Sequence, residues 1–338
     1  MDKKLTIKEI ATLSGVAIST VSRVVNGRPD VGVETRKKVL AVVEQQGYVP
    51  NDAARHLKQK TSDYVAVILR GTRNMFLMSV VEKLQKHIEA AGLQFLLHYV
   101  DEREDEVAAA TRIHTERKVR GVIFLGGTAA EKKRQLEALS VPCVFATQSV
   151  QGLQLKNVSS VSVDDRAAAC AATDFLLQKG HRRIAVIGGV LDSENAIRRR
   201  YEGVQESFRR HGLPFSEKDY YTSQFALSDA YRAMGVALAH SDYTAVLAMS
   251  DTMAMGAARA IRESGRAIPK DMSLMGYDGL ELTNYFSPPL ATIYQPVDTL
   301  AETAVALLLK GLAGRPAAHV TVPFRLVEGQ SVRHIARG

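Results

Sequence analysis

The sequence predicts a small all-α domain with a helix-turn-helix, followed by a larger α/β body of two lobes in which parallel sheets are flanked by helices. Three observations lead to this prediction. Three short helical patterns occupy the first part of the chain, a polar segment follows, and the remainder alternates short apolar runs with longer amphipathic stretches. A length of 338 residues fits two to three domains of ~100–200 residues. We expect domains at 1–49 and 63–338, with a linker at 50–62.

Positive charge is concentrated at the N-terminus. The net charge is +8, and residues 1–60 contribute +5 of it, from 11 Lys and Arg against 6 Asp and Glu. A basic domain favours a polyanion as its partner. A lysine-rich face exposed to solvent has the same composition, so charge alone leaves both interpretations open.

The composition argues against several classes of protein. Apolar residues make up 46% of the chain and charged residues 24%, as in ordinary globular proteins. No stretch approaches ~18 uncharged apolar residues, and MDKKLTIKEI lacks the apolar core of a signal peptide, so we expect a cytoplasmic protein with no membrane partner. Cys143 and Cys170 have no CxxC partner or nearby His, which indicates packing residues and no metal site. No phosphate loop or nucleophile with its base appears, so we expect no enzyme and no cofactor.

The first domain has the pattern of a helix-turn-helix. Thr6 and Glu9 form a capping-box pair, and the helical repeat after them ends at Ser14-Gly15. A second helix is expected over Ala17–Val25 and a third over about Glu34–Gln46. In such a unit the second helix enters the DNA major groove. The apolar residues of the third helix that would cover the first two are Val39, Leu40, Val42 and Val43.

Polar side chains of the expected second helix can contact DNA. Thr20 and Ser22 can donate to phosphates, and Arg23 is long enough to reach a guanine edge. Ile18 and Ser19 begin the helix, where the first residues face base edges. A helical hairpin with a polar face toward solvent has the same spacing, so spacing alone does not decide between the two.

The segment YVPNDAARHLKQKTSDY, residues 48–64, has the pattern of a short helix that needs a partner. Pro50 ends the third helix, and Asn51 is a good N-cap. Ala53, Ala54 and Leu57 give an apolar face too short to be stable alone. A leucine on this face could wedge between base steps of the minor groove, whereas an ordinary linker has the same composition.

In the body, strands and helices alternate strictly, which predicts parallel sheets covered on both faces. We assign the strands to two lobes with a cleft between them, a first lobe at about 63–160 and 291–320 and a second at about 161–290 and 321–338. The first set of strands is Tyr64–Leu69, Gln94–Val100, Gly121–Leu125 and Cys143–Thr147. The second set is Val158–Val163, Arg183–Ile187, Tyr220–Phe225, Ala245–Met249 and Ser273–Tyr277.

Residues that follow the strands are candidate ligand contacts, because ligands of open α/β sheets bind at the carboxyl ends of strands. One Arg and one Asp that converge on a sugar ring can hold two or three hydroxyls in a fixed orientation. The candidates, including one residue on a helix of the second lobe, are Arg70, Thr147, Arg200, Ser250, Asp251 and Asp278.

Two further features have structural interpretations. His181, in KGHRR, is expected to fix the loop between a helix and a strand, because no second metal ligand lies at a useful spacing. Met75, Met78, Met253 and Met255 fall in expected helices, where packing in the core is the default.

Several stretches together resemble the lactose/galactose repressor (LacI/GalR) family of bacterial transcriptional regulators along nearly the whole chain. They are LTIKEIATLSGVAISTVSRVVNG, GYVPNDAARHL, GHRRIAVIGG, AMSDTMAMGAARAIRESG, MSLMGYDG and PPLATIYQP. Each stretch is moderately specific, and their occurrence in this order is highly specific. The resemblance implies a helix-turn-helix that reads an operator half-site, a hinge helix at 50–62 in the minor groove, and a periplasmic-binding-protein-like body that binds a small metabolite and dimerises.

The resemblance also maps roles onto residues of this sequence. It assigns base reading to Ile18, Ser19 and Arg23, phosphate contact to Thr20, Ser22 and Thr35, and intercalation to Leu57. Effector contact falls on the candidates at the strand ends, with Arg200 and Asp278 the firmest. The expected DNA contacts also include Thr6, Asn26, Arg28, Asn51, Ala54 and Arg55, and the expected effector contacts include Gln295.

Three positions depart from the family's pattern. Asp52 stands where many relatives carry a neutral or basic residue, and an acid near phosphates is unfavourable unless it points away. Asp30 stands where a phosphate-contacting residue is usual, and Arg28 can substitute for it. At Arg70, relatives that bind sugars tend to have a small hydroxyl residue.

Arg70 leaves two interpretations of the effector open. Two arginines facing one cleft, Arg70 and Arg200, favour an anion such as a sugar acid or a sugar phosphate. Thr147 replaces an acid found in some relatives, which fits a ligand that already carries negative charge. In the alternative, Arg70 pairs with an acidic neighbour and never meets the ligand.

Three functions are compatible with parts of the chain. A solute-binding protein of a transport system would have the same body, but it would need a signal peptide and no helix-turn-helix. An α/β enzyme would need a catalytic motif. The sequence therefore predicts a ligand-responsive, sequence-specific repressor of carbohydrate or sugar-acid metabolism genes. It would bind a pseudopalindromic double-stranded DNA operator as a homodimer and respond to a sugar, sugar acid or sugar phosphate.

Overall fold

The computed structural model describes residues 5–25, 28, 30–48, 62–71, 73–101, 104–191 and 195–335. The chain divides into two units, one ending at Lys60 and one beginning at Thr61. No helix among the described residues is long and apolar enough to span a membrane. The hinge helix expected at 50–62 lies outside the described residues except for Ser62, and so do the expected DNA contacts Asn26, Asn51, Ala54, Arg55 and Leu57.

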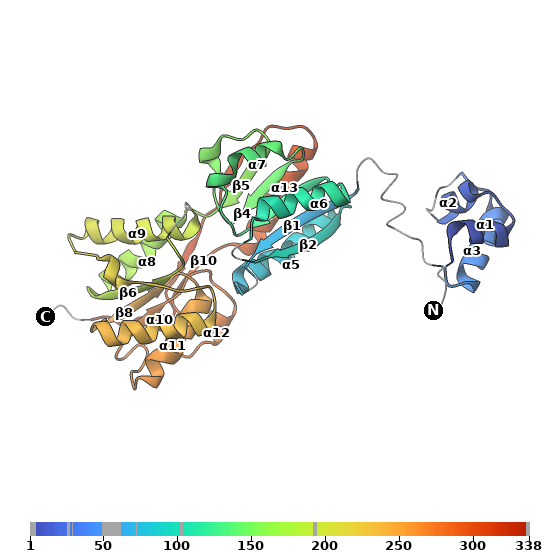
Figure 1. Cartoon of the computed structure of the whole chain (residues 1–338). Coiled ribbons are helices and arrows are strands. Elements are labelled where there is room, and N and C mark those ends of the chain that lie inside the picture. The colour runs from blue at the N-terminus through green and yellow to red at the C-terminus, as the bar shows by residue number, and fades with distance from the viewer. Residues whose placement is uncertain are drawn as a thin grey trace. The chain divides into compact units, whose positions relative to one another are not determined.

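Three helices form the first unit: α1 (Ile7–Ser14), α2 (Ile18–Val25) and α3 (Val33–Gln45) (Figure 1). The predicted capping box begins α1, because Thr6 Oγ1 accepts from the backbone N–H of Glu9 and the Glu9 carboxylate accepts from the backbone N–H of Thr6. The fully or almost fully buried side chains of this unit include Ile10, Val21, Val24 and Val39. Leu40 is 45% exposed, so the prediction that it covers the first two helices is wrong.

A six-stranded parallel sheet forms the first lobe of the second unit, with the strand order β11-β5-β4-β3-β1-β2. Alternate residues of its strands enter two separate cores, since successive side chains of a strand point to opposite faces. The strands are β1 (Tyr64–Arg70), β2 (Gln94–Val100), β3 (Gly121–Leu125), β4 (Cys143–Ala146), β5 (Val158–Ser162) and β11 (His319–Thr321).

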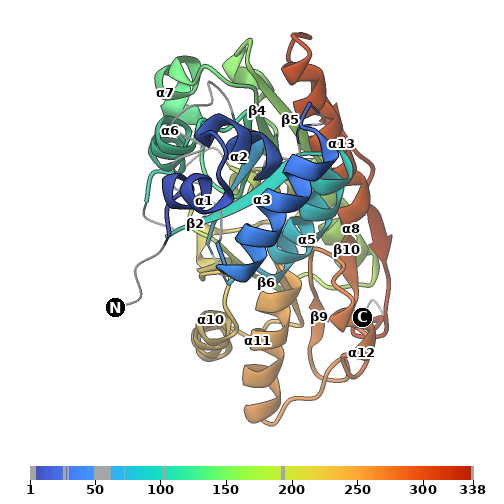
Figure 2. The ribbon, with the colours of Figure 1, turned by 90° about the vertical axis from the view of Figure 1, so that its right-hand side faces the viewer.

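Helices cover both faces of this sheet. On one face, α5 (Met75–Ala90) and α13 (Val297–Leu312) lie side by side (Figure 2). On the other face, the core includes residues of α6 (Glu106–Arg117) and α7 (Lys133–Ala138). Met75 and Met78 are 40% and 37% exposed, so the prediction that they pack in the core is wrong. Two 3-10 helices, Ala130–Lys132 and Gln151–Leu153, complete the lobe.

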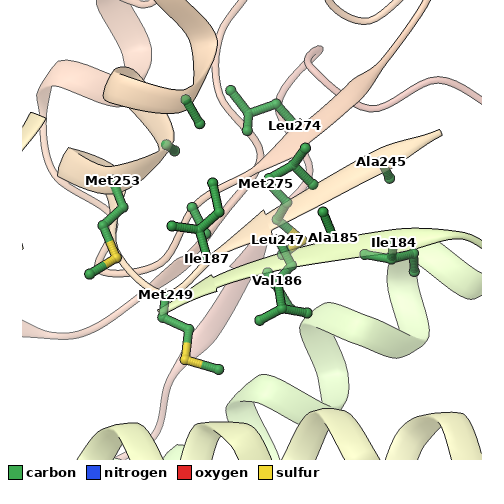
Figure 3. Close-up of a cluster of buried hydrophobic side chains, with 14 of the residues drawn as sticks. Ile184, Ala185, Val186, Ile187, Ala245, Leu247, Met249, Met253, Leu274 and Met275 are labelled. Carbon is green, nitrogen blue, oxygen red and sulfur yellow. The ribbon is translucent and has the colours of Figure 1, made fainter. Parts of the chain in front are cut away.

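The second lobe contains a four-stranded parallel sheet with the order β7-β6-β8-β9. Figure 1 shows α8 and α9 on one face and α10 and α11 on the other. Its core is continuous, and Figure 3 shows Ile187, Leu247, Met253 and Leu274 within it. The strands are β6 (Ile184–Gly188), β7 (Tyr220–Thr222), β8 (Ala245–Ala248) and β9 (Ser273–Met275). The helices are α8 (Asp165–Gln178), α9 (Ala196–Arg210), α10 (Leu227–His240), α11 (Asp251–Glu263) and α12 (Leu282–Tyr285), with a 3-10 turn at Glu217–Asp219.

The chain crosses between the lobes after β5, after β10 (Thr292–Tyr294) and before β12 (Arg325–Val327), and β10 and β12 pair antiparallel. The predicted assignment of 158–163 to the second set of strands is wrong, because β5 pairs with β4 and β11 in the first sheet. Ala291 and Ile293 belong to the core of the second lobe, so the first lobe resumes after β10 and not at 291. These short apolar segments have the same alternation whichever sheet they join, which is why the pattern did not separate them.

Candidate DNA-binding and effector sites

The surface of α2 carries the residues expected to read DNA. Val21 and Val24 are buried and fix the helix against α1 and α3, which leaves the other side of the helix accessible. Ile18 is 44% exposed, and the side chain of Arg23 is 59% exposed. Ser19 is exposed, and Thr20, Ser22 and Thr35 are half-buried. This side of α2 therefore presents one long cation among small hydroxyl groups.

Arg23 has an acidic neighbour within the same unit. Its Nη1 lies 3.6 Å from Asp30 Oδ2. The backbone N–H of Arg28 donates to the carbonyl of Arg23, and the Arg36 guanidinium donates to the carbonyl of Arg28. The Asp30 carboxylate therefore lies beside the expected base reader.

A surface cavity of about 590 Å³ lies in this unit near the start of α3. Its lining contains Thr35, one of the expected phosphate contacts, and two lysines that the sequence interpretation missed, Lys37 and Lys38. Lysines clustered around a threonine suit a phosphate oxygen, because ammonium and hydroxyl groups both donate to it. The remaining lining residues are Val16 and Glu34.

In the second lobe, Arg200 on α9 is 5% exposed and held from three sides. Its Nε donates to Asp165 Oδ1 over 2.8 Å, and its Nη1 donates to the carbonyl of Met249 over 2.6 Å. The guanidinium lies 3.7 Å from the centre of the Tyr277 ring, a cation–π contact. Its Nη1 also lies 4.0 Å from Asp278 Oδ1. The two residues that were the firmest effector candidates are therefore neighbours.

Asp278 has an unusual backbone and an incompletely bonded carboxylate. Its φ is +118°, a region that residues with a Cβ rarely adopt. Gln295 holds it there by donating to the Asp278 carbonyl through its backbone N–H and to Asp278 Oδ1 through Nε2, over 3.0 and 2.9 Å. Asp278 Oδ2 is buried and has no hydrogen-bond partner among the described residues. Strain and an unpartnered acceptor together are features of sites that bind a ligand.

Thr147 is the second candidate with strained backbone. Its φ is +78°, which is an outlier for a β-branched residue, and it stands directly after β4. Its backbone N–H donates to the carbonyl of Val161 over 2.8 Å, which holds the turn.

Ser250 and Asp251 are both fully buried, and their side chains form hydrogen bonds within the protein. Ser250 caps α11 by accepting from the backbone N–H of Met253. One carboxylate oxygen of Asp251 accepts from the hydroxyl of Thr292 over 2.7 Å, and the other accepts from the backbone N–H of Leu280 over 2.8 Å. These bonds favour a supporting role over the direct effector contact that the sequence predicted.

Acidic groups outnumber basic groups in this cluster. Asp165, Asp251 and Asp278 are at most 6% exposed, and in the described part of the lobe Arg200 is the one cation in contact with them. Burial raises the pKa of Asp251 to about 7. Burial also raises the pKa of Asp165 and holds the pKa of Asp278 well above its usual range, and the charge of Arg200 offsets only part of this.

Arg70 meets an acidic neighbour in the first lobe, as one of the two sequence interpretations proposed. Its Nη1 lies 3.7 Å from Glu106 Oε2 and donates to Thr128 Oγ1 over 3.3 Å. Lys132 contacts the same carboxylate oxygen at 2.5 Å and Asp105 at 3.4 Å. The two cations are therefore matched by two carboxylates, and Glu106 is almost fully buried.

An ion pair joins the two lobes beyond the end of β1. Arg73, three residues beyond β1, lies 3.7 Å from Asp229 in the first turn of α10. Asp229 also pairs with Arg232 on the same helix. Since Arg73 and Asp229 belong to different lobes, this ion pair joins the lobes three residues beyond Arg70 in the sequence.

The family of this chain is shown by a relative that aligns with 98% of its length. The HTH-type transcriptional regulator MalR of Clostridium butyricum is 31% identical over 336 residues, which cover 98% of this chain and 100% of the relative. The chain belongs to the lacI family of bacterial regulatory proteins. The family model "Bacterial regulatory proteins, lacI family" matches residues 6–51, and the model "Periplasmic binding protein-like domain" matches residues 173–332.

Solved structures of regulators agree with the lacI-family assignment. A complex of the transcriptional regulator CelR with cellobiose has 28% sequence identity and a TM-score of 0.73, covering 97% of this chain and 99% of that chain. The lac repressor dimer bound to operator and the anti-inducer ONPF has 27% identity and a TM-score of 0.78, covering 98% and 100%. The predicted fold class is confirmed, and this lacI-family chain is a transcriptional regulator and not an enzyme.

Sequence reasoning missed several residues of the candidate effector site of this lacI-family regulator. Asp165 stands three residues beyond β5, and it was not among the candidates although other residues that follow strands were. Tyr277 was treated as the end of a strand. Glu106 and Lys132 lie far from Arg70 in the sequence, and no local pattern connects them with it. His181 contacts Thr244 and the carbonyl of Arg333, as expected of a residue that fixes a loop.

Proposed function

We propose that this lacI-family regulator is a repressor that binds a pseudopalindromic operator as a homodimer and changes its operator affinity when a neutral sugar binds at Arg200 and Asp278. The observation that carries the proposal is the buried pair itself. A guanidinium donates hydrogen bonds, the unpartnered Asp278 Oδ2 accepts them, and the two groups are neighbours. Sugar hydroxyls both donate and accept, so one ring can satisfy the two groups together.

The charge of the two lobes favours a neutral ligand over a sugar acid or a sugar phosphate. Arg200 is shared between two carboxylates, and Asp251 adds a third. Arg70 and Lys132 are already paired with Glu106. An anionic effector would have to compete with Asp165 and Asp278 for Arg200 in a region where acidic groups outnumber basic ones. The complex of the similar regulator CelR with cellobiose, a neutral sugar, supports this choice.

On DNA, α2 would lie in the major groove, with Arg23 as the principal reader and Lys37 and Lys38 as phosphate contacts. Two chains related by a two-fold axis would occupy half-sites about one helical turn (~10 bp) apart. Exposed apolar side chains in both lobes support dimerisation, among them Met75 and Met78 on α5 and Tyr285 on α12. The similarity to the lac repressor dimer bound to operator supports this assembly.

A thermal-shift experiment tests the effector assignment. The full chain is heated with cellobiose, maltose, gluconate or glucose 6-phosphate. A ligand present at 100 times its Kd stabilises by about 2.7 kcal/mol, which raises the Tm by several degrees. We expect stabilisation by a neutral sugar, its loss in Asp278→Asn, and its retention in Asp242→Asn, where the side chain is 92% exposed in the same lobe.

Stabilisation by gluconate or glucose 6-phosphate alone would contradict the neutral class and restore the anionic one. An Asp278→Asn response equal to that of the unmodified chain would remove Asp278 from the site.

A further inference from the structure

A second group of charges lies in the first lobe, at the carboxyl ends of β1 and β3. Arg70 is the last residue of β1, and Thr128 stands three residues beyond the end of β3. Glu106 is the first residue of α6, and its side chain is 1% exposed. Lys132 ends the 3-10 helix Ala130–Lys132. Segments far apart in the sequence therefore place three donors around one carboxylate, at the end of a sheet where ligands of open α/β folds bind.

The carboxylate of Glu106 has the bonding partners of a bound anion. Its Oε2 contacts Lys132 Nζ at 2.5 Å and lies 3.7 Å from Arg70 Nη1. Its Oε1 accepts from the backbone N–H of Thr128 over 2.8 Å. Arg70 Nη1 donates over 3.3 Å to the hydroxyl of the same threonine, which connects the segments that follow β1 and β3. Two cations and a backbone N–H are donors that proteins use to hold a free carboxylate or phosphate.

The backbone after β3 leaves room for this carboxylate. Gly127 has a φ of +104°, and a Cβ at this position would lie 2.6 Å from Glu106 Oε1. Any other residue at this position would collide with the carboxylate, and its backbone conformation would be strained as well. The Glu106 carboxylate thus occupies a space that a glycine keeps open.

We propose that Arg70, Lys132 and the backbone N–H of Thr128 form an anion-binding cradle, which a carboxylate of the chain itself fills. Glu106 supplies that carboxylate and thereby excludes an anionic effector, because it neutralises cations of the cradle and occupies the place of a ligand carboxylate or phosphate. This role in specificity rests on the proposed neutral class of effector, whereas the cradle itself does not. Removal of the carboxylate should open the cradle to a small anion.

Acetate tests the cradle directly, because Glu106→Ala removes a group of the size and charge of an acetate ion. Thermal unfolding of the full-length variant is followed at pH 8 in sodium acetate and in sodium chloride of equal ionic strength. We expect acetate to raise the Tm of Glu106→Ala by about 2–4 °C relative to chloride, as a ligand at about ten times its Kd does. The matched control, Glu131→Ala, loses an exposed carboxylate of the same 3-10 helix and should respond to the salts as the unmodified chain does. A Glu106→Ala response no larger than that of the control would overturn the proposal.

A second substitution locates the acetate. Adding Lys132→Met to Glu106→Ala removes one donor of the cradle, and we expect it to abolish the additional response to acetate. Adding Lys133→Met, at the exposed neighbouring position, should leave the response in place. A response that survives Lys132→Met would place the acetate elsewhere and would overturn the cradle.

The role in specificity is tested with Glu106→Gln, which keeps the shape of the side chain and removes its charge. The full chain is heated with gluconate, glucose 6-phosphate, cellobiose or maltose. We expect one of the two anionic sugars to raise the Tm of Glu106→Gln by about 2–4 °C more than that of the unmodified chain or of Glu131→Gln. Equal responses of the three proteins would remove Glu106 from the determinants of specificity.

The two experiments separate the cradle from the effector class. If neither cellobiose nor maltose stabilises the unmodified chain, the proposed effector class fails while the acetate result still decides the cradle. Should Glu106→Ala fail to fold in both salts, the response of Glu106→Gln to the anionic sugars decides the proposal in its place.

Discussion

Arg200 Nη1 lies 4.0 Å from Asp278 Oδ1, and both side chains are more than nine-tenths buried. Replacing the arginine leaves Asp165 and Asp278 buried without a counter-charge, which usually costs more than the pair itself contributes. We predict that Arg200→Met lowers the free energy of unfolding by about 3–5 kcal/mol at pH 8, measured by urea denaturation.

The same loss should be smaller at pH 5, because burial raises the pKa of Asp165 and of Asp278 and an acid that is protonated no longer needs the cation. Arg199→Met, at the neighbouring and largely exposed position, is the control and should change stability by less than about 0.5 kcal/mol. Equal losses for the two variants would show that the cluster does not depend on its arginine.

Asp251 should give the stability of the second unit a distinctive pH dependence. Its pKa is raised to about 7 in the folded chain, above the ordinary value of 3.8, so the folded state binds more protons than the unfolded state between these values. The contribution of Asp251 to the free energy of unfolding therefore falls as the pH rises through this window, by up to about 1.4 kcal/mol per pH unit.

Thermal unfolding of the unmodified chain and of Asp251→Asn from pH 5 to pH 8 checks this. We expect the stability of the unmodified chain relative to Asp251→Asn to decline as the pH rises. Asp242→Asn, at an exposed position, should follow the unmodified chain throughout. A constant difference between the Asp251 variant and the unmodified chain would mean that the carboxylate stays ionised across the range.

Gly203 allows α9 to approach α8 closely. A Cβ at this position would lie 2.2 Å from the backbone carbonyl oxygen of Arg166, which cannot move as a side chain can. We predict that Gly203→Ala destabilises the chain by about 1–3 kcal/mol. Gly235 in α10 has no atom within 4 Å of such a Cβ, so Gly235→Ala should stabilise by about 0.5–1 kcal/mol. Urea denaturation of both variants measures the two changes in the free energy of unfolding. An unchanged free energy of unfolding in Gly203→Ala would contradict the close packing of the two helices.

Arg23 should carry base specificity. We predict that Arg23→Ala weakens binding to the selected operator by about 1–3 kcal/mol and relaxes the preference at one base pair of each half-site. Lys37→Ala should instead weaken binding to all sequences and lower the salt slope by about one. A competition assay against operators substituted at each position separates the two effects, and an unchanged base preference in Arg23→Ala would remove Arg23 from the readers.

The parts of the structure that were predictable are those specified by local patterns. The capping box at Thr6 and Glu9, the turn at Gly15 and the alternation of strands and helices each depend on residues close in sequence, and the structure shows all three. The lobe that β5 joins depends on which neighbours it meets, and nothing within 158–163 encodes that choice. The partners of Arg70 and Arg200 could not be predicted for the same reason. Glu106 and Asp165 lie more than thirty residues away from them along the chain.

The acidic partners of Arg70 and Arg200 change the expected charge of the effector. Two arginines in one cleft indicate an anion when they are counted alone. Paired with Glu106 and shared between Asp165 and Asp278, the same two arginines leave no excess of positive charge. Charge balance at a buried site therefore depends on tertiary neighbours more than on the residues that a motif identifies.

Selection of bound duplexes from a random-sequence DNA library, with the full chain, tests the central claim most directly. The selection is run without sugar and with saturating cellobiose or maltose. We predict enrichment of a pseudopalindrome whose half-sites lie about one helical turn apart, and a change in its recovery when the neutral sugar is present. Recovery of no common sequence, or of one whose binding none of the neutral sugars alters, would contradict a sugar-responsive operator-binding regulator.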